Sequence, residues 1–273
     1  MSDLGLEFRD TVAWFPTETH PTHLFIRVTE EQAKAWPAEL ALAMRRCYIT
    51  DTVVDTQAAK NTLPPTSVIA AGLPDPGATM AGDFGEILVY FLQGAGVLPK
   101  SAIGLKKWRL KQDRLKPAPY SDVVHLVLPT WPSPSTGDAL LCSEVKTKST
   151  DGDSEPIKSA IEDCEKDRTT RLAKTLLWLR DRAITGSAEG ASIAQLNRFI
   201  EAAGLPAAEK KFQAVSVVCE SLVDGELADI PAQASSEFTV VVVAVPDLKN
   251  TYTAVFNAAK LAVPPAPAAP PAA

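Results

Sequence analysis

The chain has 273 residues, of which 46% are hydrophobic and 22% charged, as is ordinary for a globular protein. It contains no apolar run near the roughly 20 residues that a membrane-spanning helix needs. Its first residues lack the basic and apolar segments of a signal peptide. We therefore expect a soluble cytoplasmic protein with no membrane partner, built as one large domain or as a catalytic domain with an appendage.

The cysteines are too widely spaced for a zinc site. They are Cys47, Cys142, Cys164 and Cys219, and no two form a Cys-x-x-Cys pair. We expect free thiols, mostly buried. Neither a Gly-x-x-x-x-Gly-Lys phosphate loop nor a Gly-x-Gly-x-x-Gly fingerprint occurs. This absence argues against ATP hydrolysis and dinucleotide chemistry.

The net charge of −6 hides an uneven distribution. Residues 100–116 hold seven Lys and Arg residues and one Asp, so this segment carries +6 and the rest of the chain carries −12. A basic stripe on an acidic body can contact phosphate without making the whole protein adhere to nucleic acid. The side chains that we expect to contact nucleic acid are Lys106, Lys107, Arg109, Lys111 and, further along the chain, Lys148.

The first part of the chain has a mixed pattern. Residues 23–28 predict a strand, and an Ala-rich helix is expected from residue 29 to residue 44. Prolines and glycines are frequent in residues 63–80, where we expect a linker. We therefore predict an N-terminal α+β region over residues 1–75, which contacts a partner or completes the core.

The remaining segments predict an α/β fold with a restriction-endonuclease-like core, in which helices flank a mixed sheet. This nuclease-like domain is expected over residues 76–260, and residues 261–273, rich in Pro and Ala, are expected to form a disordered tail. Helices are predicted at residues 86–93, 155–183 and 193–203, and strands at 105–110, 122–128, 139–148, 212–219 and 238–245.

Three charged residues carry the chemistry. Glu144 and Lys146 are two apart on a predicted strand and so share one face. Asp122 opens the preceding predicted strand and can meet Glu144 at one end of the sheet. Two adjacent carboxylates repel each other unless a cation lies between them. Mg²⁺ suits such a site, with Mn²⁺ as an alternative, and the backbone carbonyl of Val145 is a natural additional metal ligand.

Glu-x-Lys by itself is weak support, because about one such triplet is expected by chance in a chain of this length. A solvated strand edge is the alternative interpretation. Charges inside a Val- and Leu-rich strand are costly unless they are paired or bind a metal, which favours a site. Glu86, on the helix before these strands, either holds a metal-bound water or a second metal, or caps the helix. His125 is expected on the opposite face of the sheet from Asp122, as a hydrogen-bonded core residue.

Three segments carry a resemblance to a known family. They are Gly-Glu-Ile-Leu-Val-Tyr at residues 85–90, Tyr-Ser-Asp-Val-Val-His-Leu at 120–126 and Ser-Glu-Val-Lys at 143–146. These segments resemble the HamA family, the nuclease subunits of Hachiman antiphage defence systems, over roughly residues 82–185. Ser121 stands where many related nucleases have proline, which weakens an argument from the motif alone.

The resemblance implies a PD-(D/E)xK nuclease core. In it, Glu86 is the acid of the first helix, Asp122 is the motif aspartate, and Glu144 with Lys146 forms the final pair. It further implies a Mg²⁺-dependent DNA nuclease effector, controlled by a partner helicase subunit resembling HamB, that degrades DNA when infection is sensed. Two alternatives remain open: a catalytically silent subunit that binds the helicase or nucleic acid, and a nuclease acting on RNA.

Overall fold

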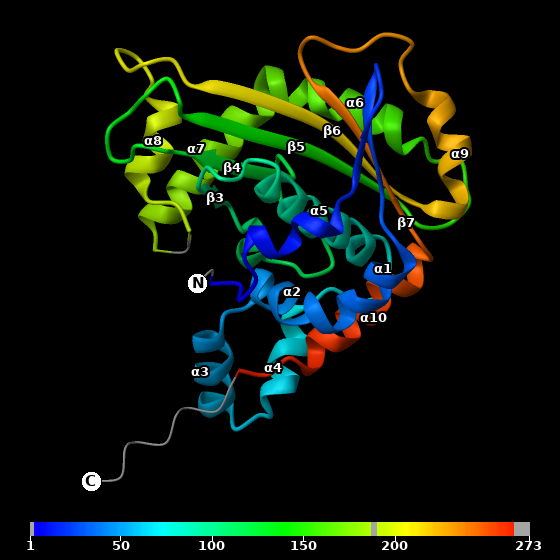
Figure 1. Cartoon of the computed structure of the whole chain (residues 1–273). Helices are drawn as coiled ribbons and strands as arrows, with labels where there is room; N and C mark the ends of the chain where they lie inside the picture. Colours follow the sequence, from blue (N-terminus) through cyan, green and yellow to red (C-terminus); the bar gives the residue numbers. More distant parts are fainter. Residues whose placement is uncertain (1–2, 187–189, 265–273) are drawn as a thin grey trace.

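The computed structural model describes residues 3–186 and 190–264. Seven strands form one sheet in the order β1-β2-β7-β6-β5-β4-β3 (Figure 1). The four strands β2, β7, β6 and β5 run parallel, whereas β1, β4 and β3 pair antiparallel with their neighbours, so the predicted mixed sheet is confirmed. The strands are β1 (Thr17–Thr19), β2 (His23–Arg27), β3 (Ala102–Gly104), β4 (Val123–Val127), β5 (Ala139–Lys148), β6 (Glu209–Cys219) and β7 (Thr239–Val245).

Helices cover both faces of the sheet, as expected for a restriction-endonuclease-like core (Figure 1). One face packs against α5 (Ala78–Ala95), α1 (Glu30–Glu39), α2 (Ala41–Tyr48) and α10 (Leu248–Leu261). The other face packs against α6 (Pro156–Lys166), α7 (Leu172–Ile184), α8 (Ile193–Ile200) and the short α9 (Val223–Glu226). Two further helices, α3 (Asp51–Asn61) and α4 (Pro65–Gly72), lie away from the sheet. Among the described helices, none is both long and apolar enough to cross a membrane.

Strand β7 shows why an unbroken apolar run forms a strand here. Val241 and Val243 pack into the core beneath α5 and α10. Val240 and Val242 belong to a second cluster on the opposite face, with Ile157 of α6. A strand covered on both faces needs apolar side chains at every position, so its sequence does not alternate. The predicted strand over residues 238–245 is confirmed.

The N-terminal region takes part in the same sheet and core. Strand β2 pairs with β7 along its whole length, from His23 opposite Val240 to Arg27 opposite Ala244. Trp36 of α1 is fully buried and its ring packs edge-on against Phe84 of α5. The N-terminal strand and helices thereby complete the core on the α5 face of the sheet.

Several predicted elements were wrong in type or extent. Residues 63–80 are not a linker, because they contain α4 and the start of α5; Pro65 occupies the first turn of α4, where a missing N–H does no harm. Residues 105–110 form no strand but the 3-10 helix Lys107–Leu110. This turn directs both Lys107 and Trp108 at one carboxylate, which the alternation of a strand would forbid.

Helix lengths were also misjudged. The helix predicted through residue 44 is divided at Leu40 into α1 and α2. The long helix predicted at 155–183 is present, but the π-helical turn Asp167–Arg171 separates α6 from α7. Helix α10 was not predicted at all, and it extends to Leu261. The rest of the predicted Pro/Ala tail, residues 265–273, lies outside the described residues.

Candidate active site

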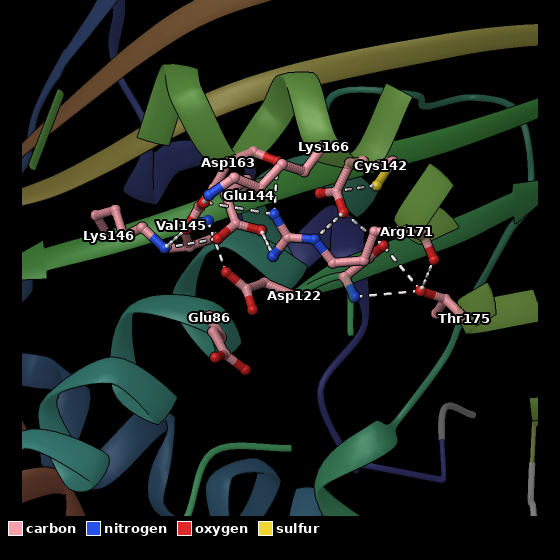
Figure 2. Close-up of polar contacts among 12 residues, drawn as sticks. Glu86, Asp122, Cys142, Glu144, Val145, Lys146, Asp163, Lys166, Arg171 and Thr175 are labelled. Atoms are coloured by element: carbon pink, nitrogen blue, oxygen red, sulfur yellow. Dashed lines mark hydrogen bonds and ion pairs between the residues drawn. The ribbon is translucent and has the colours of Figure 1, made fainter. Parts of the chain in front are cut away.

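Glu144 and Lys146 share one face of β5, as predicted, and that face points toward α6 and the π-helical turn. Lys146 Nζ donates to Glu144 Oε1 at 2.7 Å. On the other carboxylate oxygen, Arg171 Nη1 donates to Glu144 Oε2 at 3.2 Å. Figure 2 shows the Glu144 carboxylate held between these two cations. Glu144 itself is almost entirely buried, so its two oxygens depend on these partners.

Asp122 lies next to Glu144 because of where strand pairing stops. Val123, the first residue of β4, pairs with Ser143, and beyond that point the edge of β5 has no strand partner on this side. Asp122 Oδ2 instead accepts the backbone N–H of Val145 at 2.9 Å. Since the N–H and C=O of one strand residue point to the same side, the Val145 carbonyl faces this open edge too. The expected meeting of Asp122 and Glu144 therefore takes place.

Proton affinities at this edge reflect crowded negative charge. Burial, followed by repulsion from Asp122, raises the pKa of Glu144 from 4.5 to about 9, because the nearby Lys146 offsets only part of the effect. Burial lowers the pKa of Lys146, but attraction to Glu144 and a hydrogen bond to Asp163 outweigh it and raise the pKa overall. Negative charge at this edge is therefore unfavourable unless a proton or a cation compensates it.

Glu86 approaches from the opposite face of the sheet. It lies inside α5, eight residues after its first residue, so the alternative role as a helix cap is wrong. Trp108 Nε1 donates to Glu86 Oε2 at 2.9 Å. Lys107 Nζ lies 3.4 Å from the same oxygen and 3.2 Å from Asp122 Oδ1, and so connects Glu86 to Asp122. Burial, together with repulsion from Asp122 and Asp83, raises the pKa of Glu86 to about 8 despite Lys107.

Three site residues were not found from the sequence: Asp163, Asp167 and Arg171. Arg171 Nε lies 3.1 Å from Asp167 Oδ1, and its Nη2 donates to the backbone carbonyl of Asp163 at 2.7 Å. Asp167 Oδ1 also accepts from Ser121 Oγ at 2.8 Å. Their spacing of four residues each was a visible signal that they share one helix face. Without the strand packed beneath them, that face is indistinguishable from a solvated one.

The side chains predicted to contact nucleic acid are each at most 9% exposed in this structure: Lys106, Lys107, Arg109, Lys111 and Lys148. Lys111 Nζ lies 2.7 Å from Asp83 Oδ2, and Lys148 Nζ lies 2.6 Å from Glu226 Oε1. Asp3 pairs with both Lys106 and Arg109. The cations of residues 106–111 are thus paired with carboxylates from elsewhere in the fold and form no exposed stripe. Direct contact with phosphate would require these pairs to open.

His125 is a hydrogen-bonded core residue, as predicted, and it faces α5, on the other side of the sheet from Glu144. Its Nδ1 lies 2.7 Å from Gln93 Oε1, and Gln93 Nε2 donates to Ser143 Oγ at 2.6 Å. Burial, followed by repulsion from Lys106, lowers the pKa of His125 to about 3. A neutral imidazole in this position orders the interior between α5 and the sheet.

The donor set at the edge of β5 suits a hard divalent cation. Asp122, Glu144 and the Val145 carbonyl supply oxygen only, and Mg²⁺ usually takes one or two carboxylates and keeps several waters. Within residues 3–186 and 190–264, no three His, Cys, Asp or Glu side chains are grouped as a complete metal-binding set. A two-carboxylate site completed by water and substrate oxygens is the arrangement that these residues fit.

Comparison with protein-family models gives a match. A protein-family model described as HamA matches residues 9–259, which is nearly the whole chain. The match extends beyond residues 82–185 to include β2, the N-terminal helices and most of α10. A search of curated proteins finds no match.

Proposed function

Since this chain belongs to the HamA family, we propose that it is the nuclease effector of a Hachiman antiphage defence system and hydrolyses phosphodiester bonds in DNA. The observation that carries the proposal is the meeting of Asp122 and Glu144 at the open edge of β5, with Lys146 bonded to Glu144. Two acids and a lysine in this arrangement match the PD-(D/E)xK pattern in chemistry as well as in order along the chain.

Asp122, Glu144 and the Val145 carbonyl would hold Mg²⁺ or Mn²⁺, which supplies a water of lowered pKa and polarises the scissile phosphate. Lys146 is 30% exposed, so its ammonium can reach a substrate from its place beside Glu144. There it would orient the attacking water and stabilise charge developing on the phosphoryl oxygens. Arg171 fixes the Glu144 carboxylate from the α7 side.

Control by a helicase subunit resembling HamB belongs to the same proposal. The net charge is −6, and the cations of residues 106–111 are engaged with carboxylates. Both features oppose binding of DNA by the chain alone, because affinity for DNA depends on the number of phosphates that free cations neutralise. A partner that delivers DNA to the site would overcome this weak affinity.

A catalytically silent docking subunit is the second candidate. It is favoured by the cations that already neutralise the acids, namely Lys107 at Asp122 and Lys146 with Arg171 at Glu144. The two candidates differ in divalent-cation binding. Calorimetric titration with Mg²⁺ and Mn²⁺ should give heat with the wild type and none with Asp122→Asn if the nuclease proposal holds.

The decisive experiment is cleavage of linear and plasmid DNA by the purified chain together with its helicase, in Mg²⁺ and in EDTA. Glu144→Gln and Lys146→Ala should each slow cleavage by about 100-fold or more. Lys158→Ala is the matched control, because Lys158 is exposed on α6 and pairs with the nearby Glu155. If Glu144→Gln degrades DNA as fast as the wild type, the proposed function is wrong.

A further inference from the structure

An aromatic pair, with one ring exposed and the other half-buried, lies beside the candidate active site. The rings of Tyr120 and Trp178 meet edge to face, with centroids 5.9 Å apart and an interplanar angle of 62°. Tyr120 is 41% exposed, although large aromatic side chains are usually well covered in a folded protein. Its backbone has φ +68°, in the left-handed region that residues other than glycine rarely adopt. This conformation leaves the Tyr120 ring at the surface while the next residue, Ser121, is fully buried.

Helix α7 and the turn before it link this aromatic pair to the acids. Arg171, Thr175, Trp178 and Arg182 are spaced four, three and four residues apart, so they lie along one face. Arg171 bonds to Glu144, and Thr175 Oγ1 accepts the backbone N–H of Ser121 at 3.2 Å. At 1.5 Å per residue, this row is about 16 Å long. It runs from the Glu144 carboxylate to the aromatic pair and beyond; Figure 2 shows its first part, from Arg171 to Thr175.

Among the described residues, the cations around the pair have no carboxylate partner, unlike those of residues 106–111. The Arg182 guanidinium lies over the Trp178 ring, 5.8 Å from its centroid. Lys174 is exposed and precedes Trp178 by one helical turn. Neither cation pairs with a carboxylate in the part of the chain that the structure describes. Asp181 is an exposed acid on this part of α7, and the two cations Lys174 and Arg182 outnumber it there.

From this geometry we propose that Tyr120 and Trp178 form a stacking platform for unpaired bases of single-stranded nucleic acid, with Arg182 and Lys174 contacting its phosphates. Every base has a π-face, so aromatic rings beside cations hold a strand whatever its sequence. A duplex keeps its base faces covered and cannot use such a platform. This proposal rests on the proposed nuclease function, because the use of the platform would be to lead a strand toward Glu144.

Aromatic residues and arginine are also common at the centres of protein–protein interfaces. Two observations favour nucleic acid over a protein partner here. The cations Lys174 and Arg182 lack carboxylate partners, and the platform adjoins a group of carboxylates suited to phosphodiester chemistry. Docking of a protein on the same surface in place of nucleic acid would overturn the proposal.

The first test measures binding without cleavage, by fluorescence anisotropy of a labelled oligo-dT strand and of a matched duplex, with the full-length chain in EDTA. The single strand should bind more tightly than the duplex. Tyr120→Ala and Trp178→Ala should each weaken binding of the strand by about tenfold. Tyr120→Phe and Trp178→Phe keep an aromatic ring and should retain affinity. Val53→Ala, at an exposed apolar position on α3, is the control for surface truncation.

A second readout identifies the stacked residue directly. Oligo-dT should quench tryptophan emission of the wild type, and Trp178→Phe should bind the strand yet lose most of this quenching. Equal affinity of Tyr120→Ala and the wild type for oligo-dT would overturn the platform. So would variants that bind the strand normally but lose association with the helicase partner.

Failure of the platform and failure of the nuclease proposal can be told apart. A chain that binds oligo-dT through Tyr120 and Trp178, but never cleaves it in Mg²⁺ or Mn²⁺, has a platform and no nuclease activity. A chain that cleaves DNA, and does so equally well after Tyr120→Ala, is a nuclease without the platform. Melting temperatures of Tyr120→Ala and of the two Phe variants should stay close to that of the wild type. Tyr120 is exposed, and phenylalanine keeps most of the packing of the half-buried Trp178 against the core.

Discussion

The buried ammonium of Lys107 lies 3.2 Å from Asp122 Oδ1, on the oxygen that does not accept from the Val145 amide. Burial opposes its charge, but attraction to Glu86 and Asp122 raises the pKa of Lys107 overall. One residue of the proposed metal site is therefore already neutralised by a cation from the chain itself. Lys107 thus holds two acids from opposite faces of the sheet together and, under the proposed function, competes with a divalent ion for Asp122.

Replacing Lys107 with a neutral residue should show whether its ammonium competes with a divalent ion for Asp122. Lys107→Met leaves Glu86 and Asp122 buried without their partner, and breaking a buried ion pair costs about 3–5 kcal/mol. We expect that loss in the free energy of unfolding, measured by urea denaturation in EDTA. Added Mg²⁺ should stabilise Lys107→Met more than it stabilises the wild type. Lys158→Met, at an exposed position, should change neither quantity. A Lys107→Met protein as stable as the wild type in EDTA would contradict this account.

The raised pKa values predict how stability depends on pH. Glu144 and Glu86, at about 9 and about 8, bind a proton more tightly in the folded chain than at the ordinary value of 4.5. Their contribution to stability is therefore complete below about pH 4.5 and is lost as pH rises toward 8 to 9. In metal-free buffer, the free energy of unfolding should fall between about pH 5 and about pH 9.

Glu144→Gln should reduce that fall, because a neutral amide has no proton to lose. Glu155→Gln makes the same chemical change at an exposed position and should leave the pH dependence intact. Urea denaturation curves at a series of pH values measure the effect. A pH dependence that is identical in the wild type and in Glu144→Gln would show that the buried carboxyl does not titrate in this range.

Thr175 ties the loop before β4 to α7 and should position Asp122 through Ser121. Thr175→Val has nearly the same shape but leaves the buried Ser121 amide without its acceptor, at a cost of about 1–3 kcal/mol. We expect slower DNA cleavage, by about tenfold, equivalent to about 1.4 kcal/mol. Thr175→Ser keeps the hydroxyl and should restore most of the rate. Full activity of Thr175→Val would show that this hydrogen bond does not position Asp122 for cleavage.

Two roles of Lys148 can be distinguished: a partner in a buried ion pair, or a contact to nucleic acid. Its ammonium bonds to Glu226 and to the Ser154 carbonyl. Lys148→Met should lower the free energy of unfolding by about 3–5 kcal/mol, and the double variant with Glu226→Gln should recover much of the loss. The salt dependence of DNA binding should not change in the double variant. A shallower salt dependence with unchanged stability would instead place Lys148 at phosphate.

Much of the site was predictable because strand geometry is local. Alternation along residues 139–148 directs Glu144 and Lys146 to one face wherever the strand lies. The switch from a proline-rich loop to a run of β-branched residues put Asp122 at the start of the next strand. The apolar run of residues 238–245 likewise predicted a strand. These inferences depend only on the two-residue repeat of a β-strand and on the types of side chain a few positions away.

The charge pairing was decided by the tertiary structure alone. In sequence, residues 100–116 are a concentrated positive segment, but folding brings Asp3, Asp83, Glu86 and Asp122 to it from separate places in the chain. Burying a charge is unfavourable unless an opposite charge meets it, and the partner can come from any part of the chain that the sheet brings near. The sequence gives the sign of each charge. The partner of each charge is set by long-range contacts, which exist only once the sheet has formed.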